Sequence, residues 1–182
     1  MPLLASAPTV AHHPESLAPD IARMQAEPGA YLDLALLYGL RPDLYAAVGK
    51  GYDAYFRNIE AALTVEEREL VAWLVSIVSS STYAAGVHAA RIEGLGIAAD
   101  VLEAVRARDL NADCLTHRQR AFLNFARKMA AFPHTIVDKD IIYLKANGFD
   151  DAAILELAGL SSYVLMLGTM SNAFFKVGLR ES

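Results

Sequence analysis

Cysteine is nearly absent from this sequence, which holds one thiol, Cys114, in 182 residues. A single cysteine excludes an intrachain disulfide and any metal or redox motif built on a Cys-x-x-Cys pair. Cys114 lies in the polar segment NADCLTH (111–117), where we expect an incidental or structural thiol. Glycine-rich phosphate loops, GxSxG elbows and HExxH motifs are also missing. The sequence therefore predicts neither a metal nor a cofactor.

Basic tracts are missing as well, since the net charge is −5 and the isoelectric point is about 5.5. A chain without such a tract has no means of releasing counterions from a polyanion, which argues against nucleic acid and anionic membranes as partners. The N-terminal segment MPLLASAPTVAHH has neither a cationic region nor a long apolar region, so we expect no signal peptide. A cytoplasmic protein is the resulting expectation.

Long apolar runs are present, and two of them, 70–90 and 157–175, approach the length of a membrane span. Both runs are interrupted by polar side chains: serines and His88 in the first, and serines, Thr169 and Asn172 in the second. A lipid-facing helix rarely carries so many polar groups, whereas a helix packed against other helices can satisfy them. We therefore expect core or subunit-interface helices and no membrane span.

Strand signals are almost absent, and apolar residues recur at three- and four-residue spacing along the chain. Thr64 and Thr116 each begin a capping box, and Asp138 and Asp150 are predicted N-caps of the last two helices. These patterns predict an all-α bundle of about seven or eight helices. We expect an irregular tail over 1–15 and a single domain over 16–182, with core helices over about 41–178.

The segment 64–96 reads TVEERELVAWLVSIVSSSTYAAGVHAARIEGLG. It resembles the alkylhydroperoxidase D-like proteins of the carboxymuconolactone decarboxylase superfamily, which carry a glutamate and, twelve positions later, Cys-x-x-Cys-x-x-x-His at the start of the next helix. Glu69 and His88 match the glutamate and histidine positions. The two cysteine positions are occupied by Ser81 and Ala84.

The flanking helices resemble the peroxidase-related subgroup of that superfamily, so the resemblance covers roughly residues 14–178. It implies an alkylhydroperoxidase D-like multi-helix bundle, an oxidoreductase or antioxidant (peroxidase) assignment, and homo-oligomers from dimers to hexamers. An apolar fraction of 54% and a mean hydropathy of +0.27 agree with a buried subunit interface.

The departure from the family concerns the chemistry of sulfur. A peroxidatic thiolate depends on a thiol whose pKa can be lowered and on a sulfur that can be oxidised and reduced. Ser81 has no such redox chemistry, and Ala84 has no nucleophile. The resemblance therefore implies a protein without a two-thiol peroxidase cycle.

Glu69 and His88 would remain as a candidate catalytic pair, facing a small pocket rimmed by Ser80, Ser81 and Tyr83. One interpretation makes His88 a general acid/base tuned by Glu69, acting on a small-molecule ligand. The other makes the two a buried ion pair that serves packing only, in a catalytically silent helical oligomer with a binding or scaffolding role. The sequence leaves both interpretations open.

Overall fold

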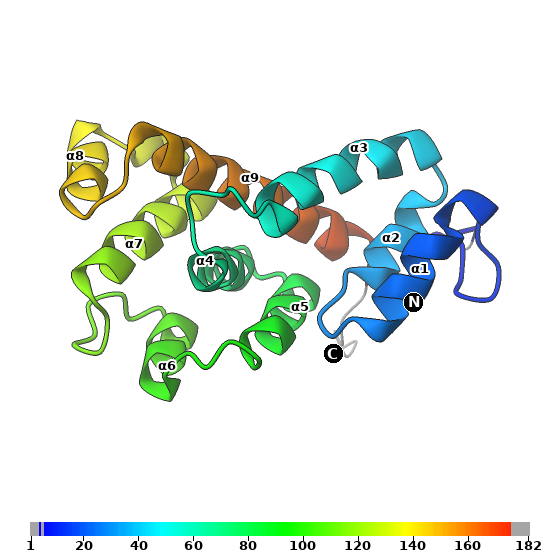
Figure 1. Cartoon of the computed structure of the whole chain (residues 1–182), viewed down its shortest axis with the longest axis horizontal. Helices are drawn as coiled ribbons and strands as arrows, with labels where there is room; N and C mark the ends of the chain where they lie inside the picture. The colour runs from blue at the N-terminus through cyan, green and yellow to red at the C-terminus, as the bar shows by residue number, and fades with distance from the viewer. Residues whose placement is uncertain (1–3, 5, 176–182) are drawn as a thin grey trace, which may run out of the picture.

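The computed structural model describes residue 4 and residues 6–175, and this part of the chain is all-helical (Figure 1). Its nine α-helices are α1 (Ala18–Ala26), α2 (Leu32–Tyr38), α3 (Pro42–Tyr52), α4 (Val65–Val78), α5 (Thr82–Ile92), α6 (Ala99–Ala107), α7 (His117–Ala131), α8 (Asp138–Ala146) and α9 (Asp151–Phe174). Short 3-10 turns cover Glu15–Leu17 and Pro133–Thr135, and a π-helical turn, Asp53–Arg57, extends α3.

Side-chain caps fix where the core helices begin, and three of the four predicted caps are confirmed. The Thr64 hydroxyl accepts from the Glu67 amide at 3.2 Å, while the Glu67 carboxylate accepts from the Thr64 amide at 3.0 Å. Thr116 makes the same reciprocal pair at the start of α7. The Asp150 carboxylate caps α9.

Two details of the helix prediction were wrong. The described residues form nine helices rather than seven or eight, because 32–38 make a separate seven-residue helix that no side chain caps. The N-cap of α8 is Val137 rather than Asp138, which already lies inside the helix. The Val137 amide donates a hydrogen bond to Oδ2 of Asp140 at 2.9 Å.

Helix α4 is the central element of the fold and is seen end-on in Figure 1, with α5, α6, α7 and α9 around it. It packs against α5, α7 and α9 through fully buried residues such as Val71 and Leu74. A smaller apolar cluster joins the N-terminal helices to α5 and α9; its buried members are Tyr31, Leu34, Leu37, Ala84, Val87 and Leu167.

Within the described residues, α9 is the one helix long and apolar enough to suit a membrane span, with a mean hydropathy of 1.5 over its best window. Its buried face packs against α4, α5 and α7, as the core helix of a bundle does. The other apolar run, 70–90, is not continuous, because the turn 79–81 divides it between α4 and α5.

Candidate functional site: a buried tyrosine, histidine and glutamate beside a cavity

Glu69 on α4 and His88 on α5 are in direct contact, because these two helices pack against each other. Nδ1 of His88 lies 2.7 Å from Oε2 of Glu69. The imidazole is fully buried, and the Glu69 side chain is only 7% exposed. Buried polar groups of this kind are stable only when they are hydrogen-bonded, and here each one is.

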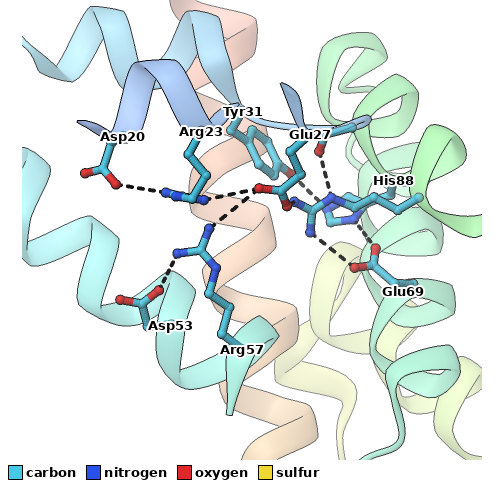
Figure 2. A network of polar contacts seen from close by, with 10 residues as sticks. Asp20, Arg23, Glu27, Tyr31, Asp53, Arg57, Glu69 and His88 are labelled. Carbon is cyan, nitrogen blue, oxygen red and sulfur yellow. Dashed lines mark hydrogen bonds and ion pairs between the residues drawn. The ribbon is translucent and has the colours of Figure 1, made fainter. Parts of the chain in front are cut away.

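Tyr31, in the loop before α2, completes the group from the other side of the imidazole. Its hydroxyl lies 2.8 Å from Nε2 of His88. The Glu69 carboxylate can only accept a hydrogen bond, so a neutral His88 carries its proton on Nδ1 and donates it to Glu69. Nε2 is then unprotonated and accepts a hydrogen bond from the Tyr31 hydroxyl. The result is a continuous hydrogen-bonded chain, the Tyr31–His88–Glu69 relay (Figure 2).

Arg91 binds Oε1 of Glu69, the carboxylate oxygen that His88 does not contact. It lies one turn beyond His88 on α5, and its Nη1 is 3.3 Å from Oε1 of Glu69. Its Nε donates to the carbonyl of Gly29 at 2.7 Å, and its Nη2 lies 3.3 Å from Glu27. Arg91 thereby ties the loop that carries Tyr31 to the helix that carries His88.

The environment sets the protonation of all three groups of the relay. Burial alone would raise the pKa of Glu69, but the His88 hydrogen bond and the Arg91 charge hold it below its usual value. Burial lowers the pKa of His88 despite the nearby carboxylate, and burial raises the pKa of Tyr31 well above 10.0. The relay at neutral pH therefore consists of a carboxylate, a neutral imidazole and a neutral phenol.

The π-helical turn Asp53–Arg57 places two more side chains at the site. The Phe56 ring stacks on the His88 imidazole with centroids 5.4 Å apart. Arg57 bonds Asp53 at 2.8 Å and lies 3.8 Å from Glu27, a carboxylate that it shares with Arg23 and Arg91 (Figure 2). π-helical turns are rare and often occur at functional sites.

A cavity of about 390 Å³ lies beside the relay and is bounded by α1, α2, α3 and α9. Tyr31 is one of its lining residues, whereas His88 and Glu69 are not. Tyr31, itself 6% exposed, is therefore the member of the relay that borders the cavity, whereas His88 is fully buried. Arg23 and Arg57 contribute charge to the lining.

The residues predicted to rim the pocket lie elsewhere and do not line this cavity. Ser81 is the buried N-cap of α5, where its Oγ accepts from the Ala84 amide at 3.4 Å. Ser80 is exposed in the preceding turn with a φ of 55°. The Tyr83 hydroxyl accepts from the Asp33 amide at 3.1 Å, and its ring lies 6.0 Å from that of Tyr31.

Neither Ser81 nor Ala84, the residues expected to match the family's cysteines, carries a thiol. Ala84 is fully buried in the apolar cluster that includes Tyr31, Leu34 and Leu167. Cys114 lies in the loop before α7, where its thiol donates to the Asp100 carbonyl at 3.4 Å. Across the described part of the chain, no group of three His, Cys, Asp or Glu side chains is placed to hold a metal ion.

The sequence pairs Glu69 with His88, and the structure brings these two together, but neither Tyr31 nor Arg91 was predicted to have a role. The signal for Arg91 was available, because three-residue spacing puts it on the same face of the helix as His88. Tyr31 carried no signal, because it is 57 residues from His88 and no motif joins the two.

The fold is that of the alkylhydroperoxidase D-like helical proteins, as two solved structures show. A peroxidase-related protein from Ralstonia eutropha JMP134, described as an alkylhydroperoxidase AhpD core, is 26% identical with a TM-score of 0.80, covering 92% of this chain and 87% of that one. A peroxidase-related protein from Silicibacter sp. TM1040 is 24% identical with a TM-score of 0.78, covering 88% and 83%.

The debrominase Bmp8 shares the fold more distantly. Its complex with 2,3,4-tribromopyrrole is 19% identical to this chain with a TM-score of 0.72, covering 87% of this chain and 83% of that one. No protein-family model and no curated protein matches the sequence. The solved structures support the alkylhydroperoxidase D-like, carboxymuconolactone decarboxylase superfamily, the family predicted from the sequence.

Proposed function

We propose that this protein has no thiol peroxidase activity and performs acid/base chemistry on a small molecule, with His88 and Glu69 as its catalytic pair. One observation carries the proposal: Tyr31 both lines the cavity and bonds Nε2 of His88. A buried imidazole alone could serve packing. An imidazole joined to a cavity through a hydroxyl can also exchange protons with a ligand.

The relay can move a proton in either direction without forming a free phenolate. An acidic group in the cavity gives its proton to the Tyr31 oxygen while the Tyr31 hydroxyl proton passes to Nε2 of His88. The imidazolium that forms is stabilised by the Glu69 carboxylate 2.7 Å from Nδ1. The reverse transfer returns a proton to the product, and the protein is regenerated.

The absence of a thiol route follows from the residues at the matched positions. If Ser81 and Ala84 correspond to the family's cysteines, neither can form a disulfide or a sulfenic acid. Cys114 cannot replace them, because its contacts are with the Asp100 carbonyl and the main core rather than with the relay.

A panel of assays tests the proposal. With peroxide and a dithiol donor, we expect consumption at the buffer rate for the wild type. On small lactones and organic acids that exchange a carbon-bound proton, we expect turnover that Tyr31→Phe and His88→Gln reduce by about 100-fold or more, the usual contribution of a general acid/base. His117→Gln, which changes an exposed histidine of α7, is the matched control and should keep full activity.

Either of two results would contradict the proposal. Dithiol-dependent peroxide turnover above the buffer rate would restore a thiol mechanism. A substrate turned over equally by the wild type and by folded His88→Gln would remove the relay from the chemistry.

The second candidate is a catalytically silent helical oligomer, and it is favoured by the complete satisfaction of His88, whose two ring nitrogens both have protein partners. Under either function we propose a cytoplasmic homo-oligomer, from dimer to hexamer. Its support is the family resemblance and the apolar side chains exposed on α8 and α9, Ile142 and Leu155 among them.

A further inference from the structure

The cavity beside the relay is lined by an unusual number of tyrosines. They are Tyr31, Tyr38, Tyr45, Tyr52 and Tyr163, and they come from the loop before α2, from α2, from α3 and from α9. Burial raises the pKa of each of these phenols, so all five are neutral at physiological pH. Aromatic rings arranged around a small space favour a flat aromatic guest, through edge and face contacts with its ring.

The charged residues of the lining carry a small positive excess. Three cations, Arg23, Lys50 and Arg57, face two carboxylates, Asp20 and Asp53. Each carboxylate is already paired with an arginine, at 2.9 Å for Asp20 with Arg23 and 2.8 Å for Asp53 with Arg57. Lys50 forms no ion pair with any residue that the structure describes. Glu27, outside the lining, also contacts Arg23 and Arg57, so Lys50, an exposed side chain at the cavity, is the lining cation left to bind an anionic ligand.

We infer that the cavity binds a small aromatic carboxylate, with its ring among the tyrosines and its anionic group toward Lys50. A volume of about 390 Å³ is in the range of small-molecule sites and has room for a one- or two-ring compound. The inference rests on the proposed function, because it names the ligand class of the same site. It concerns binding alone, so it can be tested without turnover.

Calorimetric titration of the full-length protein with 2-naphthoate tests the inference. Gly49 lines the cavity, and a Cβ added there meets no atom within 4 Å, so Gly49→Phe can fill the space. We expect wild type to bind 2-naphthoate at one site per chain and Gly49→Phe to bind at least about tenfold more weakly. Gly86→Phe is the matched control: its site on α5 is equally open but lies outside the cavity, so binding should not change.

The ligand's charge and ring are tested separately. Neutral 2-naphthamide should bind about threefold more weakly than 2-naphthoate, and Lys50→Gln should abolish this difference. Cyclohexanecarboxylate, which keeps the charge without an aromatic ring, should also bind more weakly. If Gly49→Phe does not fold, Ala46→Trp on the same helix and lining blocks the cavity instead.

The outcomes separate this inference from the proposed function. Absence of 2-naphthoate binding to wild type, equal binding by the cavity-filling variant, or equal affinity for the amide would overturn the ligand class while leaving the relay untouched. Binding as expected, together with a His88→Gln variant that turns over every substrate normally, would keep the ligand class and remove the acid/base role.

Discussion

Replacing Glu69 with alanine is expected to lower the free energy of unfolding by about 3–5 kcal/mol, the usual cost of removing one partner from a buried ion pair. The carboxylate accepts from His88 and pairs with Arg91, whose side chain is only 12% exposed. Without it, the buried imidazole N–H loses its partner, and the nearly buried guanidinium keeps only the Gly29 carbonyl and the half-exposed Glu27. Urea unfolding followed by circular dichroism measures the loss.

Glu27→Ala is the matched control, because Glu27 also contacts Arg91 but its side chain is 37% exposed. Solvent screens that pair, so we expect a loss of about 1 kcal/mol or less. Glu69→Gln should fall between the two, since the amide oxygen can still accept from Nδ1 of His88. Equal losses for Glu69→Ala and Glu27→Ala would contradict the buried character of the Glu69 pair.

Replacing Gly29 with alanine is expected to cost about 3 kcal/mol, because two penalties coincide at this residue. Its φ of +69° lies in the left-handed region, which costs a residue with a Cβ about 1–2 kcal/mol. The added Cβ would also lie 2.5 Å from the Val87 carbonyl oxygen and 2.7 Å from Cγ of Arg91. The loop before Tyr31 must then move away from α5.

Gly96→Ala separates the two penalties, because Gly96 has nearly the same φ, +68°, and a Cβ there meets nothing within 4 Å. It should cost about 1 kcal/mol from the backbone conformation alone. Thermal or urea unfolding of both variants gives the comparison. If the two alanines cost the same, the loop does not approach α5 as closely as the structure indicates.

Much of the fold could be predicted from the sequence because its helix starts are encoded locally. Thr64 with Glu67, and Thr116 with Gln119, satisfy free amides within three residues, so the pattern is visible in the sequence. The uncapped helix 32–38 and the Val137 cap of α8 were missed because neither has a strong local signal.

The candidate site could be predicted only in part. Glu69 and His88 lie 19 residues apart on consecutive helices, so a family spacing could bring them together. Tyr31 reaches His88 through the packing of the N-terminal helices on α5, a contact between distant segments that no spacing encodes. The cavity has no local signal for the same reason, because its lining residues come from the N-terminal helices and from α9, while Ala84 is covered by that apolar cluster.

The relay is tested most directly by nitrogen-15 NMR of the His88 imidazole, titrated from pH 8 to pH 5 in wild type and in Tyr31→Phe. We predict a neutral ring at pH 7 with its proton on Nδ1, a pKa below 6.5, and a changed Nε2 shift when the tyrosine hydroxyl is removed. Because an unfolded chain takes up this proton near pH 6.5, the free energy of unfolding should fall as the pH drops below that value. A doubly protonated ring at pH 7 would contradict the relay. So would an Nε2 chemical shift that is the same in wild type and in Tyr31→Phe.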